Sequence, residues 1–404
     1  MTDLLRDGLS QHAAQKTSLT RKLTVDGATE AYPVYRIKLD QLYYNDQNDR
    51  IATWISQYRS QHGGQAPEPA DREAYNQIIE GFIVESNPDA IRKTTANIKL
   101  VEQREPGVVL NDGRIIDGNR RFTCLRQLSA EDAKFGWFEA VILDRSIESS
   151  AKQIKLLELS IQHGEEGKVD YDPIDRLVGV YHDILETGLL TPEEYARSTN
   201  ESVADVKKRM ELAELMLELL EFINAPGQFH IARDLKLYYP LEELQKLLKK
   251  CRTGDEREDL KNSVFVNILL RPAGDMTRFI RGFKNIMGSE QQEDFLEEQQ
   301  EIAAEVINIL PAPQEMSSQV IRDQIRTRED LCGTLEQSMD KYLFRTRKTE
   351  TRNRPILLAE KATGFLESID VNILSRLGDS ELQRLRRQLD LLEKAADEIR
   401  RKLP

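Results

Sequence analysis

Two arginines follow a glycine at the end of a β-branched run, within residues 115–121 (IIDGNRR). Apolar side chains in residues 122–128 then recur at helical spacing, so Gly118 marks a turn from strand to helix. Free N–H groups at a helix start attract anions, and guanidinium groups suit phosphate oxygens. This pattern predicts a nucleotide-phosphate site, with an ordinary Asp-Gly turn carrying two surface arginines as the alternative. Its candidate ligands are Gly118, Asn119, Arg120 and Arg121. Asp117 is the candidate catalytic residue, able to orient an arginine, a hydroxyl or a metal-bound water.

A second candidate site is a pair of helix starts eleven residues apart, at Thr191 and Ser202. Each places a hydroxyl cap ahead of an acidic residue in the first helical turn. Two short helices joined by a polar turn are typical of a helix-turn-helix, although a helical hairpin with a charged face has the same pattern. The second helix is expected to contact DNA with its early residues. These candidate residues are Ser202, Lys207, Lys208 and Arg209.

The elements that must position these residues follow from local patterns. Residues 51–58, 74–84 and 89–100 have helical spacing, whereas residues 108–110 and 114–116 flank an Asn-Asp-Gly turn that predicts a hairpin. From residue 149 onward strand patterns nearly vanish. The expected fold class is therefore an α+β domain followed by all-α domains. The expected parts are a flexible arm (1–30), the α+β domain (31–148), a helical domain with the helix-turn-helix (149–250) and a helical C-terminal domain (251–404).

The last helical segment has heptad spacing. Its seam residues alternate in steps of three and four, which suits either self-association or packing within the chain. They are Leu382, Leu385, Leu389, Leu392, Ala396, Ile399 and Leu403. We expect a homodimer through these C-terminal helices. The basic segment of residues 341–354 precedes Pro355 and is expected to be a solvated linker.

Composition narrows the classes of function. The chain has 404 residues and a net charge of −12, which argues against coating nucleic acid non-specifically but allows one local basic surface. Its three cysteines are scattered, so they predict neither disulfides nor a metal site, and they suit the cytoplasm. No apolar stretch is long enough for a membrane span. The expected location is cytoplasmic, with possible association with the nucleoid, and no membrane partner is expected.

Residues 105–126 resemble the phosphate-binding motif of the ParB/sulfiredoxin-like superfamily. In that family a P-x-x-V strand, a hairpin and a G-x-R-R helix start follow one another. Here Pro106 and Val109 match the strand, and residues 118–121 match the helix start. ParB relatives continue into a helix-turn-helix, so the likeness covers roughly residues 32–220. Asn119 stands where the family usually has Glu, and where sulfiredoxins carry their reactive Cys.

The resemblance implies a domain that binds CTP, or another nucleoside triphosphate, together with Mg²⁺ and acts as a slow CTPase switch on a DNA-binding protein. The family's E-N-x-Q-R motif supplies further nucleotide contacts. Its nearest match is residues 158–163, in which Glu158 and Gln162 would close over the nucleotide and His163 replaces the Arg. Other members of the superfamily suggest a small-molecule kinase or an NTP-dependent nuclease component. A protein-interaction scaffold that keeps the fold without the nucleotide is the third possibility.

Overall fold

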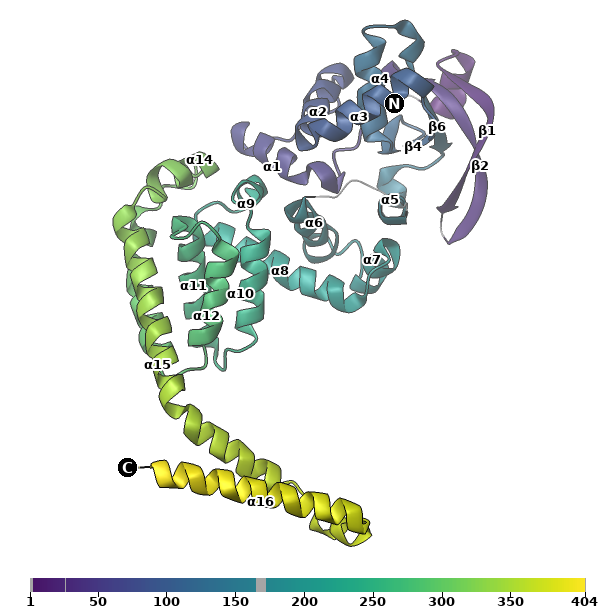
Figure 1. Ribbon diagram of the computed structural model, residues 1–404. Helices are drawn as coiled ribbons and strands as arrows, with labels where there is room; N and C mark the ends of the chain where they lie inside the picture. The colour runs from purple at the N-terminus through teal and green to yellow at the C-terminus, as the bar shows by residue number, and fades with distance from the viewer. Residues whose placement is uncertain (1–2, 26, 165–171, 404) are drawn as a thin grey trace. The chain divides into compact units, whose positions relative to one another are not determined.

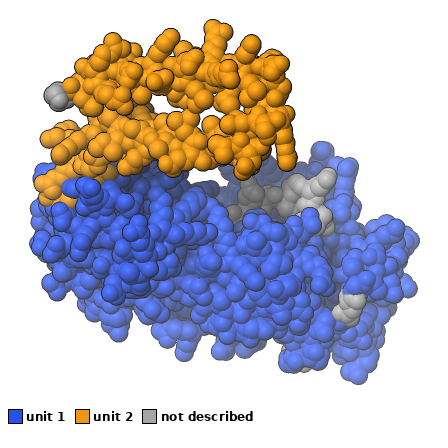
Figure 2. Space-filling view, turned by 90° about the horizontal axis from the view of Figure 1, so that it is seen from below, with its two compact units in different colours: residues 1–340 blue, residues 341–404 orange. Residues whose placement is uncertain are grey.

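The computed structural model describes residues 3–25, 27–164 and 172–403. Contacts within the chain divide it into two compact units, residues 1–340 and residues 341–404 (Figure 2). A six-stranded mixed sheet occupies the N-terminal part of the first unit, and helices follow it. The expected α+β domain followed by helices is therefore confirmed at this coarse level. Among the described residues, no helix combines the length and apolar character needed to cross a bilayer.

The sheet has the strand order β1-β2-β6-β4-β5-β3. Neighbouring strands are antiparallel except for the parallel pairs β4–β6 and β3–β5. The strands are β1 (Ala14–Val25), β2 (Ala28–Lys38), β3 (Tyr43–Tyr44), β4 (Gly107–Leu110), β5 (Arg114–Asp117) and β6 (Trp137–Leu143). The predicted hairpin joins β4 to β5, and Gly113 in its turn has φ +94°. At Gly113 an added Cβ would lie 2.2 Å from the Gln41 carbonyl oxygen, so the turn requires glycine in both conformation and space.

Helices cover both faces of the sheet (Figure 1). On one face, residues of α1 to α4 share a core with Tyr44 and Phe138 of the sheet. On the other face, Ile154, Leu157 and Ile161 of α5 pack against β2, β4, β5 and β6. The bounds are α1 (Ala52–Gln61), α2 (Arg72–Ser86), α3 (Pro88–Val101), α4 (Asn119–Ser129) and α5 (Ile147–Gly164), with short helices η1 (Leu4–Gly8), η2 (Leu39–Gln41), η3 (Asp49–Ile51) and η4 (Ala133–Phe135).

The N-terminal segment differs from the expected flexible arm. Residues 14–25 form β1, an edge strand that pairs with β2 along most of its length. Leu23 and Val25 are buried, whereas the middle of the strand is exposed on both faces. That exposure explains the weak periodicity of the sequence there, because a strand without a buried face has no need to alternate polar and apolar residues.

The remainder of the first unit is helical, and the expected boundaries near residues 148 and 250 do not separate compact units. One reason is that α6 packs on α1, where the Thr53 amide donates to Asp175 Oδ1 at 3.1 Å. The bounds are α6 (Pro173–Val180), η5 (Tyr181–Glu186), α7 (Pro192–Thr199), α8 (Val203–Phe222), α9 (Phe229–Asp234), α10 (Tyr238–Leu248), α11 (Gly254–Leu270), α12 (Met276–Ile286), α13 (Gln292–Ile309), α14 (Ser318–Val320) and η6 (Ile321–Ile325).

The second unit is a helical hairpin. It comprises the end of α15 (Glu329–Glu367), the short helix η7 (Val371–Arg376) and α16 (Asp379–Lys402). The linker expected over residues 341–354 is instead part of α15, which continues through Pro355. A proline inside a helix removes one backbone hydrogen bond, but a long exposed helix can tolerate this where water takes over the bond. No described side chain in residues 351–403 is buried.

Candidate functional site

The backbone at the predicted phosphate site has the expected conformation. β5 ends at Asp117, Gly118 has φ +105°, and α4 begins at Asn119. No side chain caps this helix start, and the first helical hydrogen bond runs from the Phe122 amide to the Gly118 carbonyl oxygen at 2.9 Å. Within the described chain the amides of residues 119–121 have no acceptor. Three N–H groups therefore point out of the helix start, where the helix dipole also favours an anion.

Glycine is needed at position 118 for two reasons. Its positive φ strains any side chain, and an added Cβ would lie 2.7 Å from Cζ of Phe138. The same Cβ would approach the Arg121 guanidinium to 3.3 Å. The Phe138 ring and the Arg121 guanidinium therefore both lie close to the turn and leave no room for a side chain at position 118.

Asp117 holds two arginines. Its Oδ2 accepts from Arg121 Nη2 at 3.2 Å and from Arg21 Nη1 at 2.8 Å, and Arg21 also donates to the Pro106 carbonyl oxygen at 2.6 Å. Arg21 comes from β1, at a distance of 96 residues along the chain, and sequence reasoning missed it because no local motif marks it. Of the three roles predicted for Asp117, this geometry suits the orientation of an arginine.

Arg120 differs from its neighbour. It is half-buried, and in the part of the chain that the structure describes it makes no hydrogen bond or ion pair. Burial lowers the pKa of the Arg120 guanidinium, and the like charges of Arg50 and then Arg121 lower it further. Arg50 belongs to η3 and was not among the predicted residues. A partly desolvated cation beside two other cations is unfavourable unless an anion joins it.

Two further polar atoms at this turn are buried without a partner among the described residues: Asn119 Oδ1 and Arg121 Nε. Buried polar groups normally find a hydrogen-bond partner, so each such group needs an explanation. Arg121 Nε is a donor beside the open amides, which suits an anionic oxygen. Chemically, the turn can hold a multiply charged anion, and it offers no nucleophile among its described side chains.

The chain matches no known family model and no curated protein.

Glu158 and Gln162 of α5 lie in a different group of side chains. Gln162 Nε2 donates to Glu158 Oε1 at 3.0 Å, and both side chains are buried. Lys155 Nζ lies at the centre of this group, 2.7 Å from Asp49 Oδ1, 3.4 Å from Asp183 Oδ2 and 3.9 Å from Glu158 Oε2. Burial raises the pKa of Glu158 to about 8, and the charges of Asp49 and Asp183 add to this against the effect of Lys155. Asp49 connects this group to the arginines along the chain, because it is the residue before Arg50.

The predicted helix-turn-helix is formed by α7 and α8. Thr191 caps α7 in a capping box with Glu194, Ser202 caps α8, and Asn200 turns the chain with φ +56°. Two of the three basic residues of α8 are, however, paired with carboxylates. Arg209 binds Glu201 through two hydrogen bonds of 2.8 Å, and Lys208 Nζ binds Glu242 Oε1 at 3.0 Å. Lys207 alone of the three is exposed without a partner in the described part of the chain.

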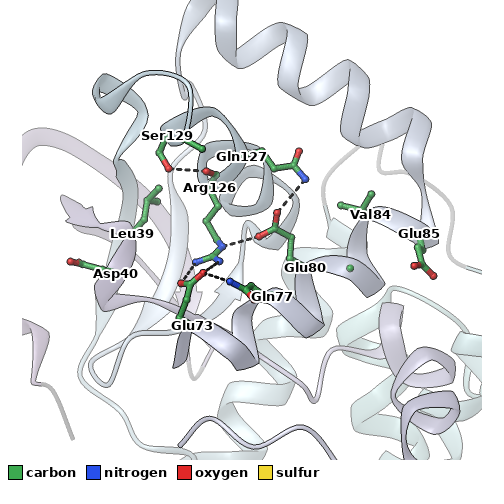
Figure 3. Close-up of a pocket in the computed structure, with 12 residues that line it drawn as sticks. Leu39, Asp40, Glu73, Gln77, Glu80, Val84, Glu85, Arg126, Gln127 and Ser129 are labelled. Atoms are coloured by element: carbon green, nitrogen blue, oxygen red, sulfur yellow. Dashed lines mark hydrogen bonds and ion pairs between the residues drawn. The ribbon is translucent and has the colours of Figure 1, made fainter. Parts of the chain in front are cut away.

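A pocket of about 680 Å³ lies farther along α4, between α2 and the end of α4 (Figure 3). Arg126 points across it and donates to Glu73 and Glu80, at 2.8 Å in each case. Asp40 and Glu85 also line it. Four acidic residues line this pocket, and its one arginine is already paired with two of them. The pocket therefore repels a phosphate, so it is not the site predicted from the sequence.

Proposed function

We propose that the turn at Gly118 binds the phosphates of a nucleoside triphosphate. The observation that carries the proposal is Arg120, a half-buried guanidinium without a protein partner in the described chain, next to Arg50 and Arg121. Three open amides at the start of α4 face the same ligand. An anion that accepts from these groups removes both the repulsion among the arginines and the cost of the unmatched donors.

A triphosphate suits this site better than a single phosphate. Arg50, Arg120 and Arg121 come from two elements, η3 and α4, so their charges are spread over more than one anionic group. A backbone turn at a helix start takes one phosphate, as in other nucleotide-binding folds, and the arginines take the others. The base would be selected by residues beyond this turn, and the resemblance to ParB proteins makes CTP the first nucleotide to test.

Turnover at this site is expected to be slow. Fast phosphoryl transfer needs an acidic group that activates the attacking hydroxyl and carboxylates that hold magnesium. Asp117 is occupied by two guanidinium groups, so it fits neither role in this arrangement. Among the described residues there is also no group of three potential metal ligands. In our proposal Mg²⁺ therefore arrives on the phosphates, and the nucleotide acts as a switch.

DNA binding by α8 is not part of this proposal, because Lys208 and Arg209 already have carboxylate partners. In the proposal, the route from the nucleotide to the helices runs through Arg50. Arg50 follows Asp49, which binds Lys155 of α5. A nucleotide that draws in Arg50 therefore acts on the segment that holds α5 and η5.

The test is a titration of CTP, ATP, GTP and UTP with Mg²⁺ by calorimetry. We expect one of the four to bind and Arg120→Ala to weaken it at least about tenfold, the effect of losing one charge-assisted hydrogen bond. Arg92→Ala is the matched control, because Arg92 is an exposed arginine of the same domain. Circular dichroism checks that both variants fold. Undiminished binding by Arg120→Ala would refute the proposal. If the protein bound none of the four nucleotides, the alternative of a protein-interaction scaffold would be favoured.

Turnover measurements separate the remaining alternatives. Slow hydrolysis that duplex DNA stimulates supports a ParB-like switch. Fast transfer of phosphate to a small hydroxyl compound supports the kinase, and cleavage of DNA supports the nuclease component.

A further inference from the structure

Helix α16 carries an apolar seam that its own unit leaves partly uncovered, although Leu382 and Leu385 are half-buried. Leu389 is 41% exposed, Leu392 44% and Ile399 65%. In Figure 1 α16 runs back alongside the second half of α15. Within this hairpin the later seam residues keep the exposed fractions given above. The end of α15 adds further exposed apolar residues, among them Ile356, Leu357, Leu358 and Phe365.

A helical hairpin without a buried core is not stable by its own contacts. Helices in proteins depend mainly on the packing of an apolar face, because ordering the chain is costly in entropy. A contiguous apolar surface of this kind marks a protein–protein contact. The second unit therefore needs a partner that covers its seam.

We propose that the partner is a second copy of the same chain, with the two α16 helices packed antiparallel. The ends of the helix support this directly. Its first turn carries Asp379 and Glu381, and its last turn carries Arg400, Arg401 and Lys402. In an antiparallel pair each acidic start lies against the partner's basic end, whereas a parallel pair brings like charges together.

The seam also matches itself in this orientation. Taking Leu382, Leu389 and Ala396 as the a positions and Leu385, Leu392 and Ile399 as the d positions, each a residue meets a d residue of the partner. The layers are then Leu382 with Ile399, Leu385 with Ala396, and Leu389 with Leu392, and each occurs twice by symmetry. The 24 residues of α16 give a seam of about 36 Å.

The flanking charges agree with the same register. The residues that border the layers pair as Asp379 with Arg400, Glu381 with Lys402 and Arg386 with Glu393. All three pairs are attractive, and each again occurs twice. In a parallel pair only Glu381 with Arg386 is attractive, because Gln388 faces Glu393 and Ala395 faces Arg400. The charge pattern therefore selects the antiparallel arrangement.

The first experiment measures the mass of the full-length protein by sedimentation equilibrium. We expect the protein to be a dimer at a protein concentration of about 50 µM. Leu389→Asp should convert it to a monomer. Leu391→Asp is the control: Leu391 lies on the same helix and is 50% exposed, but it is off the seam, so the dimer should persist. A monomeric wild type overturns the proposal, as does equal dissociation by both variants.

The second experiment tests the orientation by charge exchange. Arg386→Glu and Glu393→Arg should each weaken the dimer about fivefold or more, because each makes two attractive pairs repulsive. The double variant should restore the affinity to within about twofold of wild type. In a parallel dimer Glu393→Arg would have little effect and the double variant would not recover. That result would overturn the antiparallel arrangement.

Discussion

Two groups of buried charge in the first unit differ in one respect, and the difference indicates which of them is built for a ligand. At the start of α4, Arg50, Arg120 and Arg121 lie together, and Arg120 has no carboxylate partner in the described chain. In the other group, Lys155 is surrounded by Asp49, Glu158 and Asp183. The lysine group contains its own counterions, whereas an anion from outside would give Arg120 the counterion that the described residues do not supply.

The lysine group has a structural role that follows from its location. Asp49 belongs to η3, Lys155 and Glu158 to α5, and Asp183 to η5. A single ammonium therefore joins three segments from both sides of the sheet domain. The Lys155 side chain is as buried as the surrounding core. Removing one partner of this group therefore leaves uncompensated charge behind.

Lys155→Met tests this interpretation and should have the largest effect on stability. The substitution keeps the side-chain length but leaves the buried acidic groups of Asp49, Glu158 and Asp183 without a cation. We expect a loss of roughly 3–5 kcal/mol in the free energy of unfolding, measured by urea denaturation.

Lys152→Met is the matched control for this experiment. Lys152 also lies on α5 and binds Glu194 at 2.8 Å, but it is 42% exposed, so we expect a loss of less than about 1 kcal/mol. Equal effects of the two substitutions would show that the buried group contributes no more than a surface pair.

The second prediction concerns pH. Burial raises the pKa of Glu158 to about 8 and that of Asp183 to about 7, well above unfolded carboxyl values near 4. Burial also raises the pKa of Asp175, to about 8. A raised carboxyl pKa means that the folded state binds protons more tightly. Each such carboxyl group contributes fully to the free energy of unfolding below its unfolded pKa. This contribution is lost as the pH rises through the folded pKa. Stability should therefore decline between about pH 5 and pH 8, by up to about 1.4 kcal/mol per pH unit for each proton released.

Glu158→Gln removes one of these titrating groups and keeps the hydrogen-bonding shape. The free energy of unfolding of this variant, measured by urea denaturation, should depend less steeply on pH between about 6 and 9 than that of the wild type. Asp175 and Asp183 still titrate in the variant. A slope equal to that of the wild type would mean that Glu158 stays ionised in the folded protein throughout this range.

The comparison also shows which parts of the molecule local sequence patterns predict. Gly113 and Gly118 both have positive φ, and both were located by the turn chemistry of their neighbours. The cap residues Thr191 and Ser202 were identified in the same way. These features depend on residues within four positions of one another, so a single sequence contains their signal.

The charge groups depend on contacts that no local pattern contains. Arg21 meets Asp117 across 96 residues, and Lys155 meets Asp49 across 106. Glu158 and Gln162 were assigned to the nucleotide from a motif likeness, whereas their contacts are with each other and with Lys155. Which acids surround a lysine is decided by how α5, η3 and η5 pack, and periodicity alone does not determine that packing.

Gly179→Ala is the third prediction, and it perturbs the link between the two groups. An added Cβ on α6 would lie 2.7 Å from Asp49 Oδ2, so the carboxylate that binds Lys155 must shift. We expect a loss of about 1–3 kcal/mol in stability. Because Arg50 follows Asp49, binding of the nucleotide found in the titration should weaken as well.

Gly282→Ala is the control for this substitution. It is also a helical glycine, but its nearest neighbour, the Met339 sulfur, lies 3.8 Å from an added Cβ. Alanine should be neutral there or should stabilise by up to about 1 kcal/mol. If Gly179→Ala lowered stability but left nucleotide binding intact, the two groups would be independent of each other.

The smallest expected effect is at the helix-turn-helix, where the same distinction between partnered and unpartnered charge applies. Lys208 and Arg209 are bound to Glu242 and Glu201. Lys207 is exposed, so water can solvate its charge. Lys207→Ala should therefore change the affinity for duplex DNA by less than about twofold in a fluorescence anisotropy titration at physiological salt. Glu242→Gln, which releases Lys208, should have the larger effect and increase affinity. A loss of tenfold or more in Lys207→Ala would mean that α8 contacts DNA phosphates despite these ion pairs, so that the absence of a protein partner would no longer distinguish the arginine group as the site built for an anion.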